Sequence, residues 1–171
     1  GIVKLVFEII VTLVFAVLVA ISAFQTVTLQ ESAMEPTYSV SEKFFVNRAL
    51  YKVSSPKRGD VIVFKTSASD SAALHIRRVI GLPGETVQVK DGKIYINGKV
   101  YEENGAYQDM TDGGLANSAI TLESGEYFVL GDNRNNSEDS RFSDIGNISK
   151  KYIVGKVWFT VSPKNKIGFI K

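Results

Sequence analysis

The sequence has no cysteine and a single histidine, and each scarcity excludes a class of functional site. Without cysteine, the 171 residues can form no disulfide, no thiol nucleophile and no cysteine-based zinc site. His75 is the only histidine, so a Ser-His-Asp triad would have to use it and a multi-histidine metal site cannot form. The pair Asp132-Asn133 lacks the ligand spacing of an EF-hand. The sequence therefore predicts neither a metal nor another cofactor.

An excess of one charge is also lacking. The 20 lysines and arginines nearly balance the 18 aspartates and glutamates, which leaves a net charge of +2. Such a balance gives no strongly basic surface for phosphate backbones, so we expect no nucleic-acid partner. Hydrophobic residues make up 44% of the chain, which is enough for the core of one ordinary domain with an appendage.

A long hydrophobic run occupies the N-terminal part of the chain. Residues 2–24 contain only two charged side chains, Lys4 and Glu8. As a helix, these 23 residues span roughly 34 Å, which exceeds the roughly 30 Å of a bilayer's hydrocarbon core. We therefore predict a transmembrane anchor over 2–24 and a second domain over 25–171. The alternatives are a signal peptide cleaved near residues 20–22 and a helix buried in the core.

The rest of the chain consists of short apolar runs between turn residues, which is the pattern of a mainly β fold. Asp91-Gly92 and Asn97-Gly98 favour two-residue hairpin turns and predict a three-stranded meander. Residues 104–118 predict a surface excursion, and residues 148–152 indicate a helical turn. This pattern favours a folded-sheet or barrel-like architecture. The expected strands are 25–30, 43–46, 61–64, 74–80, 86–89, 93–96, 100–101, 127–130 and 153–161.

Four short segments share their order and spacing with the motifs of one known family. They are SAMEPT at 32–37, RGDVIVF at 58–64, IRRVIGLPGETV at 76–87 and GDNRNNSEDSR at 131–141. Together they resemble the type I signal peptidases, membrane-anchored serine proteases that remove signal peptides outside the cytoplasmic membrane. The resemblance implies a barrel-like β-sheet fold after one N-terminal transmembrane helix. It also implies a single-pass protein of the cell membrane with its β domain on the extracytoplasmic face.

The family cuts with a Ser/Lys dyad, and this chain differs at both dyad positions. In the family the serine hydroxyl attacks the scissile carbonyl, and a neutral lysine takes its proton. The motifs place Ala33 at the nucleophile position and Arg77 at the general-base position. Alanine has no reactive atom, and arginine stays protonated and has no lone pair to accept a proton. The resemblance therefore predicts a site that has lost its catalytic groups.

The resemblance also assigns roles to residues around the two dyad positions. A bound peptide would run along residues 28–32 and 74–77. Ser137 stands where the family has a serine that contacts the lysine, and Arg78, Asp139 and Arg141 stand where charged residues pair and hold the loop together. The residues expected to contact substrate are Gln30, Glu31, Ser32, Met34 and His75.

A displaced catalytic group is the alternative to a lost one. Ser32 precedes Ala33, but neighbours in an extended segment point to opposite faces. We therefore expect Ser32 to point away from the cleft if Ala33 faces it. His75 lies two residues before Arg77, so it shares that strand face about 6–7 Å away. It could act as a base only if the substrate shifted by that distance. Otherwise we expect it on an edge strand at the protein surface.

Three functional hypotheses follow. The chain resembles the dyad-less signal-peptidase-like proteins of Gram-positive pilus gene clusters, those of streptococci in particular. Such a protein would bind a pilin or exported precursor as an added strand and assist pilus assembly at the lipid membrane. The second hypothesis is an active type I signal peptidase with a displaced nucleophile, or one inactivated by engineering. The third is an inactive relative that regulates a true signal peptidase.

Overall fold

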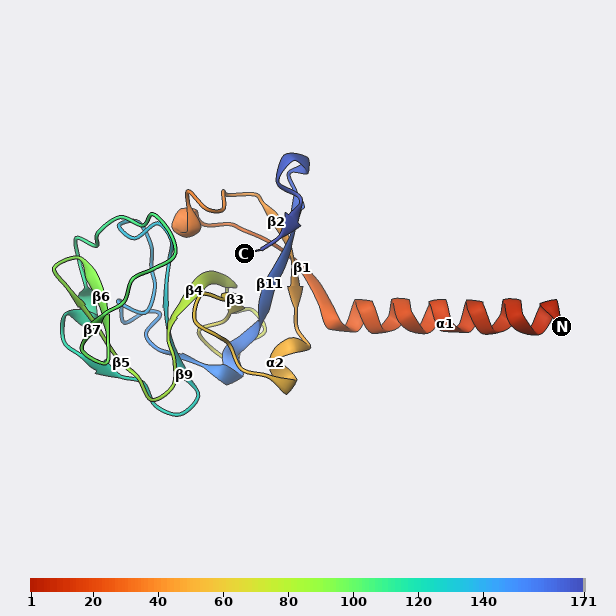
Figure 1. Cartoon of the computed structure of the whole chain (residues 1–171), viewed down its shortest axis with the longest axis horizontal. Coiled ribbons are helices and arrows are strands. Elements are labelled where there is room, and N and C mark those ends of the chain that lie inside the picture. The colour runs from red at the N-terminus through yellow and green to blue at the C-terminus, as the bar shows by residue number, and fades with distance from the viewer. Residues whose placement is uncertain (171) are drawn as a thin grey trace.

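A long helix projects from a β-rich body (Figure 1). The structure, a computed structural model, describes residues 1–170, so residue 171 of the predicted domain 25–171 lies outside the described residues. The helices, α or 3₁₀ (η), are α1 (Ile2–Ala23), η1 (Ser32–Met34), α2 (Leu50–Val53), η2 (Gly114–Asn117), η3 (Lys150–Tyr152) and η4 (Lys164–Lys166). The strands are β1 (Phe24–Thr28), β2 (Lys43–Asn47), β3 (Val61–Phe64), β4 (His75–Gly81), β5 (Thr86–Lys90), β6 (Lys93–Ile96), β7 (Lys99–Val100), β8 (Ile120–Thr121), β9 (Glu126–Leu130), β10 (Ile148–Ser149), β11 (Ile153–Ser162) and β12 (Gly168–Phe169).

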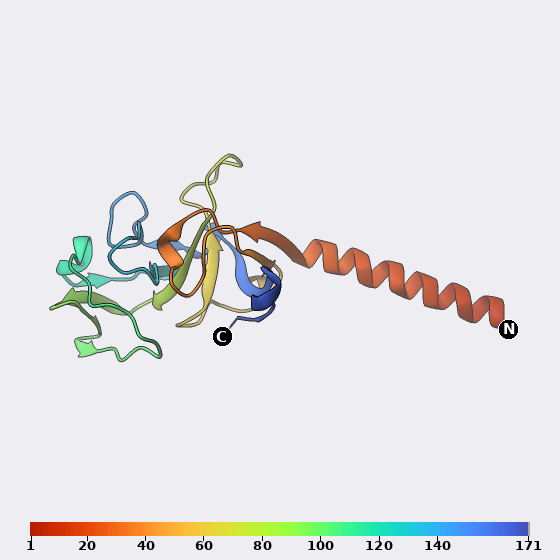
Figure 2. The ribbon, with the colours of Figure 1, turned by 90° about the horizontal axis from the view of Figure 1, so that it is seen from above.

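Helix α1 stands away from the body in both views (Figures 1 and 2). None of its 22 residues is buried, so it is not the buried core helix that was one alternative. By length and composition it can cross a bilayer. The helix ends at Ala23, one residue before the predicted end of the anchor, because Phe24 already has the extended backbone of β1.

The larger sheet has eight strands in the order β1-β2-β11-β3-β4-β9-β10, with β12 paired to β11. Every pair in it is antiparallel. All four residues of β3 are buried, as expected where both faces of a β-branched strand are covered. The register of β11 shifts against both β2 and β3. Such bulges increase the local bend and twist, which accounts for the predicted folded, barrel-like form.

A smaller sheet, in the order β7-β6-β5-β8, lies at the end of the body remote from α1 (Figure 1). Its two hairpins turn at the predicted dipeptides. The φ angles are 51° and 75° at Asp91 and Gly92, and 52° and 77° at Asn97 and Gly98. A positive φ at both central residues is the mark of a type I′ turn, so the predicted meander is confirmed.

Residues 104–118 form only in part the surface excursion predicted from their composition. Met110 is 6% exposed and Ala116 is fully buried. Both pack in a hydrophobic cluster with residues of β5, β6 and β9. The turn-forming residues carry the chain across the small sheet, while these two apolar side chains anchor it there.

Several short elements carry no sequence pattern that would have predicted them. The strands β8, β10 and β12 have two residues each, which is too short for a period of two to be recognised. The helical turn expected at 148–152 is β10 followed by η3. Helix α2 has four residues, and its hydrogen bonds to the Asn47 side chain position it beside β2.

Neighbouring phenylalanines in β2 test which face of the larger sheet carries the core. Phe44 is 1% exposed and Phe45 is 38% exposed. We expect Phe44→Ala to lower the free energy of unfolding by about 3–5 kcal/mol because it opens a cavity, and Phe45→Ala to lower it by about 1 kcal/mol or less. Denaturant unfolding of the detergent-solubilised chain, followed by Trp158 fluorescence, measures both values. Equal losses would contradict this assignment of faces.

Candidate functional site

A cavity of about 760 Å³ lies where the chain after β1, the start of β4 and the loop after β9 meet. Ala33, at the predicted nucleophile position, lines the cavity together with Ser137. Arg77, at the predicted base position, is fully buried behind it, two residues after the lining residue His75. Four of the five predicted substrate contacts line the cavity, namely Gln30, Glu31, Ser32 and His75. The fifth, Met34, has no exposed surface and packs in the hydrophobic core instead.

The backbone that carries Ser32 and Ala33 is not extended, so one prediction about its side chains was wrong. Ser32–Met34 forms the 3₁₀ turn η1. In a 3₁₀ turn successive side chains are about 120° apart, rather than on opposite faces. Ser32 and Ala33 therefore both line the cavity. The Ser32 hydroxyl accepts a hydrogen bond from Asn136 Nδ2 at 3.2 Å.

The turn η1 is held against the loop after β9 by hydrogen bonds from the backbone and the side chain of Asn133. The Asn133 amide donates to the Ala33 carbonyl at 2.9 Å, and Asn133 Nδ2 donates to the Ser32 carbonyl at 3.2 Å. Gly131 lies at the closest approach, because a Cβ there would sit 2.5 Å from the Ala33 carbonyl oxygen and 2.1 Å from Ser137 Oγ. Only glycine allows this approach.

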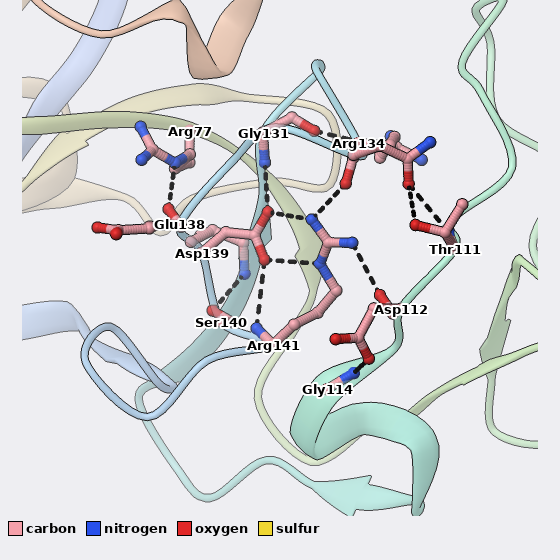
Figure 3. Close-up of polar contacts among 12 residues, drawn as sticks. Arg77, Thr111, Asp112, Gly114, Gly131, Arg134, Glu138, Asp139, Ser140 and Arg141 are labelled. Atoms are coloured by element: carbon pink, nitrogen blue, oxygen red, sulfur yellow. Dashed lines mark hydrogen bonds and ion pairs between the residues drawn. The ribbon is translucent and has the colours of Figure 1, made fainter.

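Arg77 is fully buried and hydrogen-bonds to three acceptors. Its Nε donates to the Glu138 carbonyl at 2.8 Å (Figure 3). Its Nη1 donates to the Ile76 carbonyl at 2.7 Å, and its Nη2 donates to Glu31 Oε2 at 2.6 Å. A buried cation needs such acceptors and a counter-charge. Glu31, which follows β1, supplies the counter-charge.

One edge of β4 is unpaired along 75–77 within the described part of the chain. Its pairing with β3 covers His75, whereas its pairing with β9 begins at Arg78. The Val79 backbone bonds to Asp60 and Gly59 on the β3 side. Because backbone groups alternate sides along a strand, those of Ile76 point to the unpaired edge. This is the edge whose carbonyl Arg77 contacts.

Glu31 and His75 form the exposed part of the same network. His75 lies at the unpaired edge of β4, but it is less exposed than the surface residue that we expected. It starts β4, its side chain is 16% exposed and it lies 2.9 Å from Glu31 Oε1. Its ring also stacks on Phe64, 5.6 Å between centroids. Burial alone would raise the pKa of Glu31, but the bond to His75 and the charge of Arg77 lower it to about 2.

Ser137 does not make the contact predicted for it. Its buried Oγ has no hydrogen-bond partner among residues 1–170, and the carbonyl of the next residue, Glu138, bonds to Arg77 instead. An arginine reaches further than a lysine and spreads its donors over a wide fork. The guanidinium therefore extends to Glu31 and Glu138, and the serine hydroxyl is left without a partner.

The family model for signal peptidase, peptidase S26, matches residues 2–162 of the chain. The chain belongs to this family. It is 34% identical to signal peptidase I of Bacillus licheniformis, over 93% of this chain and 88% of that protein. It is 37% identical to a signal peptidase I of Bacillus amyloliquefaciens, over 93% and 87%. A crystal structure of a signal peptidase I from Enterococcus faecalis V583 matches with a TM-score of 0.49, at 32% identity, over 61% of this chain and 98% of that one.

The family and the apolar helix α1 together indicate that the protein is associated with a membrane. The charged residues predicted to hold its loop do form pairs, in two separate sets. Asp139 is fully buried and accepts from Arg141 Nε and Nη2 at 2.8 and 2.9 Å (Figure 3). Arg78 pairs with Asp132 through bonds of 2.8 and 2.6 Å.

Two further charged residues of this family member's loop were missed by the sequence analysis. Asp132 is the partner of Arg78, and Arg134 bonds to Glu103 and lies 4.2 Å from the Tyr107 ring centroid. Both belong to the GDNR stretch at 131–134, so their positions were recognised as a motif. Their partners lie outside the loop, and no spacing within the motif identifies them.

Because Glu31 is the counter-charge of the buried Arg77, the free energy of unfolding should depend on its carboxylate. We expect Glu31→Gln to lower the free energy of unfolding by about 1–2 kcal/mol, less than for a deeply buried pair because Glu31 is partly exposed. Because its folded pKa of about 2 is below the usual 4.5, its contribution is complete above about pH 4.5 and is lost toward pH 2. Denaturant unfolding across this range should show a smaller loss of stability in the variant than in the unchanged chain.

Glu138→Gln is the matched control for this prediction. It removes a carboxylate that lines the same cavity, but Arg77 bonds to the Glu138 backbone carbonyl and not to its side chain. Stability and its acid dependence should therefore stay close to those of the unchanged chain. Equal effects of the two variants would show that the Glu31–Arg77 pair has no special role.

Proposed function

We propose that this chain is a membrane-anchored, signal peptidase-like protein that binds extended precursor segments without cutting them. The observation that carries the proposal is the state of Arg77. This residue stands where the family has its general base, and it is a fully buried guanidinium with three acceptors. A charged guanidinium donates hydrogen bonds and cannot take a proton from a nucleophile.

The nucleophile position supports the same conclusion. Ala33 lines the cavity and has only a methyl group as its side chain. Ser32 brings a hydroxyl to the same cavity, but its activation would need a base within hydrogen-bond reach. Its hydroxyl accepts a bond from the Asn136 amide, and an amide cannot serve as that base. His75 bonds to Glu31 and not to Ser32.

The cavity still offers two backbone edges to a peptide. Ile76 presents its backbone groups along the unpaired edge of β4, and its carbonyl oxygen has a second lone pair besides the one that Arg77 uses. Across the cavity, Leu29 turns its backbone toward Glu42 and Ser41. By strand alternation, Gln30 turns its own toward the cavity. An extended peptide fits between the two edges as an added strand.

The proposed ligand is a pilin or another exported precursor, and the proposed role is to hold it during pilus assembly. This role rests on the resemblance to dyad-less proteins of pilus gene clusters. Membrane association supports it, since exported precursors pass the membrane surface. Regulation of a true signal peptidase is the alternative role, and it would use the same cavity to bind signal peptides.

Cleavage is the second candidate function, because the curated relatives are named signal peptidase I. We expect the detergent-solubilised chain to show no cleavage of a precursor that carries a signal peptide, since loss of nucleophile or base lowers turnover on the order of 10⁶-fold in a serine protease. Gel electrophoresis and mass spectrometry of the products measure this. Cleavage after an Ala-x-Ala site would overturn the non-catalytic proposal.

The double variant Ala33→Ser with Arg77→Lys is the companion to this experiment. It restores both groups of the dyad, and Ser137 Oγ is free to contact the lysine. Cleavage by the double variant, but by neither single variant, would show that the dyad alone is missing. An inert double variant that still folds would show that the cleft has changed in other ways as well.

Peptide binding can be tested without reference to cleavage. Asn136 is exposed and lines the cavity, so Asn136→Trp should fill part of it and weaken binding of a fluorescein-labelled precursor peptide at least tenfold, a loss of about 1.4 kcal/mol. Asn104→Trp is the matched control, because Asn104 is exposed but lies outside this cavity. Fluorescence anisotropy gives both dissociation constants, and equal affinities would place the peptide elsewhere.

A further inference from the structure

A second cavity, of about 570 Å³, is lined by four cationic side chains. Arg48 and Lys52 come from the segment that contains α2, and Lys150 and Lys151 come from η3, about a hundred positions later. No acidic residue lines this cavity. Two segments that are distant in the sequence therefore bring positive charge to one place, in a chain whose net charge is only +2.

The cluster lies where the membrane helix ends. The Arg48 amide donates a 2.8 Å hydrogen bond to the carbonyl of Ala23, the last residue of α1. Figure 1 shows α2 beside the base of that helix. A helix that spans the hydrocarbon core ends at the level of the lipid headgroups. Arg48 is therefore held at the depth of the lipid phosphates.

The positive charges of this cluster are not neutralised within residues 1–170. None of the four cations forms an ion pair there. Lys150 bonds to the Ser54 carbonyl and the Ser55 hydroxyl, both neutral. Asp60 contacts the cavity-lining Tyr51, but it is already paired with Lys156 at 2.7 Å. The cavity therefore favours an anionic ligand.

Apolar groups around the cations indicate which anion fits. Tyr51, Ile153 and Val154 line the cavity together with the basic side chains. Val53, at the end of α2, is 89% exposed. A free phosphate ion would gain nothing from these surfaces, whereas a phospholipid presents a phosphate and the start of its acyl chains together.

We propose that this cavity binds the headgroup of an anionic phospholipid from the leaflet in which α1 ends. Arg48, Lys52 and Lys151 contact the headgroup charge, while Lys150 holds the loop at Ser54. Basic residues near a membrane surface each contribute on the order of 1 kcal/mol of attraction to anionic lipid. The contact gives the β domain an attachment to the membrane surface besides its links to α1, which are the chain crossing from Ala23 to Phe24 and the bond from the Arg48 amide to the Ala23 carbonyl.

The test uses the full chain reconstituted in phosphatidylcholine bilayers with spin-labelled phosphatidylglycerol or phosphatidylcholine. Electron paramagnetic resonance measures the fraction of each lipid that the protein immobilises. We expect a preference for phosphatidylglycerol of roughly fivefold or more, reduced by salt. In the triple variant Arg48→Gln, Lys52→Gln, Lys151→Gln this preference should fall to near one.

A triple variant of equal charge change is the matched control. Lys90, Lys93 and Lys99 are exposed residues of the small sheet, which lies at the far end of the body from α1 (Figure 1). Changing all three to glutamine should leave the preference intact. Equal losses in the two triple variants would overturn the proposal, because general charge attraction would then explain the preference.

Two further measurements separate the remaining explanations. The variant Arg48→Lys, Lys52→Arg, Lys151→Arg keeps the charge and should keep the preference, and its loss there would show that packing and not charge is responsible. Inorganic phosphate in excess should not displace the spin-labelled lipid beyond the effect of chloride at equal ionic strength. Specific displacement by phosphate would identify a free anion as the ligand and overturn the assignment to lipid.

Discussion

The buried positive charge of Arg77 is the constraint on which the candidate site depends. A guanidinium without exposed surface is tolerated only when acceptors surround it. It finds them in three different parts of the chain: its own strand, the segment after β1 and the loop after β9. The need to give Arg77 its hydrogen-bond acceptors therefore determines how these three parts of the chain meet around the cavity. The low pKa of Glu31, about 2, has the same origin, because the bond to His75 and the charge of Arg77 stabilise its carboxylate against the effect of burial.

The loop after β9 is held by a second set of buried charges. Asp139 accepts from the Gly131 amide and from Arg141, and Arg78 bonds to Asp132 (Figure 3 shows the Asp139 set). Such pairs specify one arrangement of an irregular segment, because any other arrangement would leave a buried charge unpaired. The loop can then support η1 through the close approach at Gly131. These contacts hold the loop against Ala33, at one wall of the cavity that Ser137 also lines.

The outline of the fold was predictable because it rests on local patterns. The β-branched run at β3 and the two type I′ hairpins depend on neighbours in sequence, and the structure has them where the patterns indicate. The conformation of η1 was not predictable in this way. We assumed an extended backbone at Ser32 and Ala33, but hydrogen bonds from Asn133, about a hundred positions away, hold a 3₁₀ turn there. The contact of His75 with Glu31 was not predictable either, because the two residues are 44 positions apart in the sequence.

The sequence by itself determined the family and an N-terminal segment long and apolar enough to cross a bilayer. Both follow from composition and from the order of the motifs, which also pointed to residues 33 and 77. Only the tertiary structure decided what those residues do. It joined Arg77 to Glu31 across 46 positions, left Ser137 Oγ without a partner, and gathered four cations at the end of α1. These arrangements depend on distances between segments that are far apart in the chain. The burial of side chains and the pairing of charges in the folded protein set those distances, and they cannot be predicted from short sequence patterns.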